Sequence, residues 1–136
     1  MAMTRSGSGG LLLDTHVLLW HLEDNPRLGP LSRGLITSSG TVSYSAASLW
    51  EVTIKSMLGK ITLPDAFDAG LHSTGLSELS VEGEHARAIE QFPELIDQDP
   101  FDQLLLAQAG ITARTFITAD QVLLDLGLPF VADARR

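Results

Sequence analysis

Short segments with the composition of β-strands alternate with helical segments from Leu11 to the end of the chain. Strands that are joined through helices pair in parallel, because each helix carries the chain back to the edge of the sheet from which the previous strand started. The alternation therefore predicts an α/β fold with a central parallel sheet. The expected strands cover residues 11–14, 41–44, 76–79, 115–117 and 129–131.

Capping residues, prolines and glycines mark the ends of the helices between these strands. Ser45 and Asp99 stand where a side chain can cap a helix N-terminus, and Pro64 stands at a first-turn position. Gly59 and Gly110 are placed to end two helices. The helix that Asp99 begins carries more apolar residues than one stripe holds, so we expect it to be buried on most sides. The expected helices cover residues 15–21, 31–38, 45–59, 64–72, 82–92, 99–110 and 120–126.

Length and composition indicate one domain that folds without disulfides. A chain of 136 residues can bury most of its apolar surface, and the absence of cysteine excludes disulfides and thiolate zinc sites. Residues 1–10 are polar and rich in Gly and Ser, so we expect a flexible tail followed by a single domain over 11–136. The sequence has neither a membrane-spanning apolar stretch of about 18 residues nor a signal peptide, which favours a cytoplasmic protein.

The charge of the chain bears on whether it binds nucleic acid. Its formal net charge is −8, which opposes the phosphate attraction on which such binding depends. This objection weakens if a bound metal neutralises several carboxylates and basic side chains surround the site. The candidate basic residues are Lys55, Lys60, Arg87 and Arg114.

Four carboxylates stand at the ends of expected strands or within the helices beside them: Asp14, Glu51, Asp102 and Asp120. In an open parallel sheet these positions converge on one crevice, so residues far apart in sequence meet there. Carboxylates that are crowded together repel each other, and hard cations with oxygen ligands relieve this repulsion. The pattern therefore indicates metal-dependent chemistry, with hydrolysis as the leading hypothesis.

Each carboxylate also has a purely structural interpretation. Asp14 and Asp120 each stand where an aspartate can cap the following helix. Asp102 falls in the first turn of a helix, where a carboxylate gains roughly 0.3–1 kcal/mol from the helix dipole. Glu51 interrupts an apolar helix and is expected to be at least partly buried, which is costly without a partner, and Lys55 one turn later can supply an ion pair.

The aromatic and histidine residues are interpreted as structural. Tryptophan and phenylalanine near the acids are expected in the core rather than as platforms for base stacking: Trp20, Trp50 and Phe101. The histidines lack the spacing of a metal motif and are expected mostly at the surface or at helix ends: His16, His21, His72 and His85.

Four segments together resemble a known family. Residues 11–20 read LLLDTHVLLW, residues 45–60 contain SAASLWEV followed by Lys55 and LGK, residues 99–109 begin DPFD, and residues 118–120 read TAD. In order and spacing they resemble a PIN-domain ribonuclease of the VapC toxin type. The likeness extends from Leu11 to about Val131.

This resemblance implies a three-layer α/β/α PIN-like domain with a central parallel sheet that cleaves RNA as an endoribonuclease with Mg²⁺ or Mn²⁺. It also implies a homodimer and inhibition by a cognate antitoxin protein, as in a toxin–antitoxin pair. The metal ligands and catalytic residues implied are Asp14, Glu51 and Asp102, with Asp120 as a fourth that acts through water. Polar support is implied for Thr15 and Thr118. Gln103 and Asp97 depart from the pattern, where many relatives carry Arg and His, and both departures concern substrate contacts.

Two other classes of function remain open on the residues alone. A receiver-like phosphoacceptor domain needs a pair of acids after the first strand and a lysine after a late strand, whereas Asp14 stands alone and Asp120 follows Ala119. A non-catalytic α/β binding module needs none of the acids, and the presence of all four argues against it.

Overall fold

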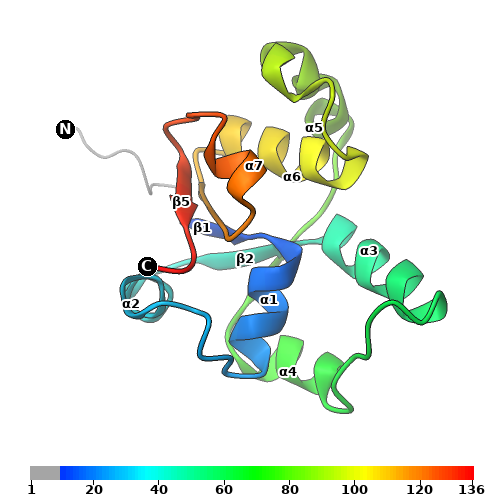
Figure 1. The fold of residues 1–136 in the computed structure, drawn as a ribbon, viewed down its shortest axis with the longest axis vertical. Helices are drawn as coiled ribbons and strands as arrows, with labels where there is room; N and C mark the ends of the chain where they lie inside the picture. The colour runs from blue at the N-terminus through cyan, green and yellow to red at the C-terminus, as the bar shows by residue number, and fades with distance from the viewer. Residues whose placement is uncertain (1–9) are drawn as a thin grey trace.

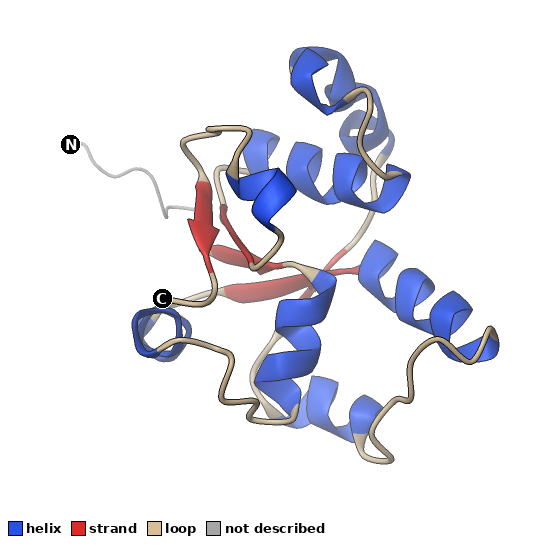
Figure 2. Cartoon of the chain, in the orientation of Figure 1, coloured by secondary structure: helices blue, strands red, loops and turns tan. Residues whose placement is uncertain are grey.

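The computed structural model describes residues 10–136, and within them five strands form one sheet (Figure 1, Figure 2). The sheet order is β3-β2-β1-β4-β5, and every neighbouring pair is parallel. The predicted parallel sheet is confirmed. The strands are β1 Leu11–Leu13, β2 Val42–Ser45, β3 Ser77–Leu79, β4 Thr115–Thr118 and β5 Val131–Asp133.

Helices cover both faces of this sheet, so the domain has three layers (Figure 1). Helices α1, α2 and α4 lie on one side, and α5, α6 and α7 lie on the other. Two 3₁₀ segments, Ala88–Gln91 and Pro93–Leu95, precede α6. The helices are α1 Thr15–Leu22, α2 Pro30–Ser38, α3 Ala46–Met57, α4 Phe67–Ser73, α5 Gly83–Arg87, α6 Pro100–Ile111 and α7 Gln121–Leu124.

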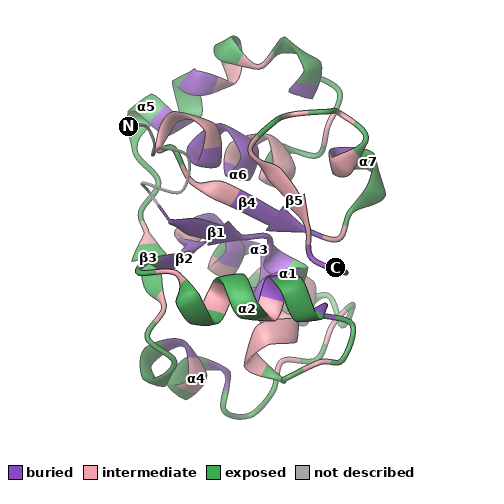
Figure 3. Cartoon of the chain, turned by 90° about the vertical axis from the view of Figure 1, so that its left-hand side faces the viewer, coloured by how far each residue is buried: buried purple, intermediate pink, exposed green. Residues whose placement is uncertain are grey.

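The central strand β1 is apolar on both faces because both faces are covered. Successive side chains of a strand point to opposite sides. Leu11 and Leu13 therefore join the core cluster under α1 and α4, and Leu12 joins the cluster under α6. All three are buried, as are most strand residues in the middle of the sheet (Figure 3). The three-layer α/β/α class is thereby confirmed.

Two of the expected helices have different limits. Pro64 does not begin a helix, because residues 65–66 form a turn in which Phe67 N donates to Pro64 O, and α4 begins only at buried Phe67. The single helix expected over 82–92 is divided into α5 and a 3₁₀ segment. Pro93 disfavours helical backbone at Phe92, which adopts φ −129° and ψ 68°, so the last turn tightens before it.

Two other boundaries shift for reasons of packing. Helix α6 continues through Gly110 to Ile111 instead of stopping at the glycine. A Cβ at Gly110 would lie 2.4 Å from Cζ of Phe92, so the glycine makes room for this ring within the helix. The last strand is β5 at Val131–Asp133 rather than at 129–131, and Phe130 before it already contributes its carbonyl to Phe116 N.

The N-terminal limit of the fold lies one residue earlier than expected. Gly10 is buried, and its carbonyl accepts a hydrogen bond from Thr115 N. Its φ of +83° suits glycine, and a Cβ there would lie 2.1 Å from the carbonyl oxygen of Thr41. Gly10 thus belongs to the fold, whereas residues 1–9 of the expected tail lie outside the described residues. Across residues 10–136, no helix is both long enough and apolar enough to cross a membrane.

Candidate functional site

Asp14 directly follows the central strand β1 and both of its carboxylate oxygens are held. Oδ1 accepts a hydrogen bond from Thr15 N at 2.8 Å, which caps α1, and Oδ2 accepts from Thr118 Oγ1 at 2.7 Å. Thr118 ends the neighbouring strand β4, so two adjacent strand ends fix one carboxylate. Burial raises the pKa of Asp14, and the negative charge of Glu51 raises it further, although the two hydrogen bonds act in the opposite direction.

Glu51 projects from α3 toward the same strand end. It is buried, with a relative exposure of 8%. Its Oε1 accepts from Thr15 Oγ1 at 2.7 Å, and its Oε2 accepts from Lys55 Nζ at 2.5 Å. Because Thr15 has one hydroxyl proton, which it donates to Glu51, the contact between Thr15 and Ser48 at 2.9 Å requires Ser48 to be the donor.

Asp102 lies in the first turn of α6, and Asp99 caps this helix by accepting from Phe101 N at 2.9 Å. The pKa of Asp102 is raised from 3.8 to about 7, mainly by burial and also by the charges of four other carboxylates, Asp14, Asp99, Asp120 and Glu51. Helix α6 thus places this carboxylate where its charge is disfavoured.

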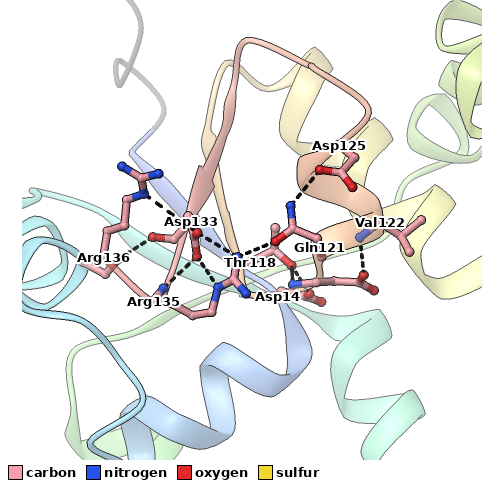
Figure 4. A network of polar contacts seen from close by, with 10 residues as sticks. Asp14, Thr118, Gln121, Val122, Asp125, Asp133, Arg135 and Arg136 are labelled. Carbon is pink, nitrogen blue, oxygen red and sulfur yellow. Dashed lines mark hydrogen bonds and ion pairs between the residues drawn. The ribbon is translucent and has the colours of Figure 1, made fainter.

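Asp120 is exposed and caps the short helix α7. Its Oδ1 accepts from Val122 N at 2.9 Å, and its own N–H donates to Thr118 Oγ1 at 3.0 Å. Thr118 therefore contacts both Asp14 and the backbone of Asp120, which is the polar support expected of it. Figure 4 shows Thr118 beside Asp14. Thr15 supports Glu51 in the same way.

All four carboxylates line one cavity of about 520 Å³ beside the carboxyl ends of β1 and β4. The structure therefore brings together the acids that are separated in sequence. The structural interpretations hold as well, because Asp14 and Asp120 are helix caps and Glu51 is paired with Lys55. Capping and clustering are compatible, since a helix that begins at a strand end directs its capping side chain toward the same crevice.

Three basic side chains line this cavity: Arg27, Lys55 and Arg135. Of the four basic residues expected there, only Lys55 is found in the lining. Arg87, the last residue of α5, pairs instead with Glu90 of the 3₁₀ segment that follows. No pattern in the sequence indicates Arg27, in the turn after α1, or Arg135, which the C-terminal segment carries to the cavity.

A polar network holds Arg135 in place (Figure 4). Its guanidinium donates to Asp133 at 2.9 Å and to Gln121 Oε1 at 2.7 Å. Gln121 in turn donates to Asp125 at 2.7 Å. The network links β5 to α7 next to Asp120, so the positively charged guanidinium of Arg135 is fixed beside the acidic cavity.

Trp50 and His85 differ from their expected positions. Trp50 is 63% exposed rather than in the core, and its ring meets Phe101 edge to face at a centroid distance of 5.2 Å. It lies on the outer side of α3, because the inner side is taken by residues such as Ala47 and Val52. His85 is buried, and its Nδ1 accepts from Glu82 N at the start of α5. His16 is exposed and lines the cavity.

The donor set suits a hard divalent cation. Each ionised carboxylate oxygen has two acceptor positions, and Asp14 and Glu51 use one position on each oxygen for the hydrogen bonds described above, so acceptor capacity remains. Oxygen ligands alone favour Mg²⁺ or Mn²⁺. Among residues 10–136, no three Asp, Glu, His or Cys side chains stand close enough to hold one ion together.

The fold and the cavity together define an α/β domain with a cluster of acids at the carboxyl edge of its parallel sheet. Residues 11–127 match the family described as PIN domain, and the chain belongs to this family. PIN domains are typically nucleases and generally depend on a metal ion. Comparison with curated protein sequences gave no match.

Three solved structures have the same fold. A chain of a toxin–antitoxin complex from Klebsiella pneumoniae has a TM-score of 0.65 at 14% identity, covering 90% of this chain and 96% of that one. A chain of VapBC2 from Rickettsia felis, bound to a DNA fragment from the promoter of the pair, has a TM-score of 0.65 at 14% identity, covering 90% and 97%. A chain of DNA-bound VapBC from Salmonella typhimurium has a TM-score of 0.59 at 19% identity, covering 90% and 96%. At these identities the likeness concerns the fold.

Proposed function

We propose that this PIN domain is a metal-dependent endoribonuclease and the toxin of a toxin–antitoxin pair. The observation that carries the proposal is the cavity, in which Asp14, Glu51, Asp102 and Asp120 come together from four separate parts of the chain. A receiver-like phosphoacceptor is not proposed, because the chain belongs to the PIN family.

In this proposal Asp14, Glu51 and Asp102 hold Mg²⁺ or Mn²⁺, with Asp120 as the fourth acid. When bound, the ion supplies a lowered pKa for water and stabilises the charge that develops on phosphoryl oxygens during hydrolysis. The chain itself positions the acids, through the hydrogen bonds of Thr15 and Thr118.

The basic residues of the cavity address the charge objection. Arg27 and Arg135 lie in the lining with the acids, so a phosphodiester backbone meets cations there although the whole chain is acidic. Arginine is suited to this role, because its guanidinium stays charged and donates hydrogen bonds to phosphate oxygens. We propose that these two residues bind phosphate groups of the RNA.

The purified chain should cleave RNA when Mg²⁺ or Mn²⁺ is present and should stop when EDTA is added, because the acids then lack the cation that they position. The measurement is the appearance of internal cleavage products from a set of labelled RNAs. Full activity in excess EDTA would contradict the metal-dependent proposal. Binding of RNA without cleavage under any metal condition would favour a non-catalytic binding module.

The toxin part of the proposal rests on the three solved structures described above, because their matching chains belong to toxin–antitoxin complexes. The match extends over at least 96% of each of those chains. We expect a homodimer, and a small antitoxin whose basic or aromatic residues enter the acidic cavity. The complex should weaken as salt increases, since the attraction is electrostatic. Light scattering of the chain and co-purification with the product of the neighbouring small gene test this, and a monomer across micromolar concentrations would contradict the dimer.

A further inference from the structure

Lys55 lies among the acids of the cavity as a fixed positive charge. It follows Glu51 by one turn of α3, and its Nζ lies 2.5 Å from Glu51 Oε2. The side chain of Glu51 is 10% exposed and that of Lys55 is 35% exposed. Lys55 also lines the cavity together with Asp99 and Asp102.

We propose that the Lys55 ammonium is a built-in counter-cation that competes with the divalent ion for Glu51 and so sets the affinity of the site for metal. The inference rests on the proposed function, because the competitor is the metal ion of that site. It assigns a role to a residue outside the four acids.

The two oxygens of Glu51 are held in different ways, and only one of them is bound by a positive charge. Oε1 is bound by the hydroxyl of Thr15, which is itself buried. Oε2 is bound by Lys55, which lines the cavity as Thr15 does. A divalent cation on Oε2 would place two positive charges next to each other, which is unfavourable at short distance in a partly buried site. Metal and ammonium thus weaken each other's binding at this oxygen, although one acceptor position on it remains open.

The side chain of Lys55 is free to move away from Glu51 when a metal ion binds. Its ammonium is carried on a flexible four-carbon stem, and about a third of the side chain reaches solvent, so the ammonium can leave Glu51 for water. Glu51 cannot leave in the same way, because it is buried and hydrogen-bonded to Thr15. A buried carboxylate without a nearby positive charge is disfavoured, so Lys55 stabilises the metal-free protein until a cation replaces it.

Lys55→Gln provides a direct test, with Lys60→Gln as the matched control. Glutamine removes the positive charge but retains a hydrogen-bond donor for Glu51, so the fold is supported. Lys60 lies just beyond the same helix, is exposed and does not line the cavity, so its substitution makes the same change in net charge. Mn²⁺ affinity is measured by titration calorimetry for the wild type and both variants at one pH and ionic strength.

Lys55→Gln should bind Mn²⁺ at least about tenfold more tightly than the wild type, and Lys60→Gln should change the affinity by less than about threefold. Without metal, the urea midpoint of Lys55→Gln should fall below that of Lys60→Gln. Added Mn²⁺ should raise the midpoint of Lys55→Gln by more than it raises that of Lys60→Gln. If Lys55→Gln binds no more tightly than Lys60→Gln, the inference is overturned while the metal site stands. If none of the three proteins binds Mn²⁺ up to millimolar concentrations, the proposed metal site fails and the inference fails with it.

Discussion

Asp14→Asn and Asp102→Asn should each reduce RNA cleavage by at least about 100-fold, because each removes a negative charge that holds the cation while keeping the shape of the side chain. The loss should appear in the rate at saturating Mn²⁺. Asp120→Asn should have a smaller effect, since Asp120 is exposed and one of its oxygens is bound to Val122 N.

Asp68→Asn is the matched control for these variants. Asp68 is an exposed carboxylate in the first turn of α4 and does not line the acidic cavity, so it reports the effect of losing one charge anywhere on the surface. Its cleavage rate should stay within about twofold of the wild type. Unaltered cleavage by both Asp14→Asn and Asp102→Asn would place the catalytic site elsewhere.

Much of the fold could be predicted because the burial pattern leaves few choices. The run Leu11–Leu13 is apolar without alternation, which suits only a strand that is covered on both faces, and β1 is that strand. The four acids could be predicted for a related reason. They stand at strand ends or in the adjoining helices, and parallel strands bring their carboxyl ends to one edge.

The parts that could not be predicted depend on contacts between distant residues. Gly110 has the local signature of a helix end, but the ring of Phe92 decides that it lies inside α6. Trp50 has the composition of a core residue, yet its position on the outer side of α3 leaves it exposed against Phe101. Arg135 reaches the cavity only because β5 pairs with β4 and directs the C-terminal segment there.

The same crowding that favours metal binding should make the metal-free protein less stable as pH rises. The pKa of Asp102 is raised from 3.8 to about 7 by burial and by neighbouring carboxylates. Below about pH 4 this carboxyl is protonated in both the folded and the unfolded chain, so it contributes nothing to the pH dependence. Between about 4 and 7 the unfolded chain releases the proton and the folded chain keeps it, so stability falls, and the penalty is complete above about pH 7.

Asp102→Asn removes this penalty, so in EDTA at pH 8 the variant should be more stable to urea than the wild type. The expected gain is about 1–2 kcal/mol, which is less than the full pKa shift implies because Asp102 is partly exposed and solvent screens its charge. The gain should shrink toward zero near pH 4, and Mn²⁺ should reverse it at pH 8 by stabilising only the wild type. Asp68→Asn should show no such pH-dependent gain, because Asp68 is exposed and outside the cavity. If Asp102→Asn is equal to or less stable than the wild type in EDTA at pH 8, the charge of Asp102 does not destabilise the metal-free fold, and its raised pKa is contradicted.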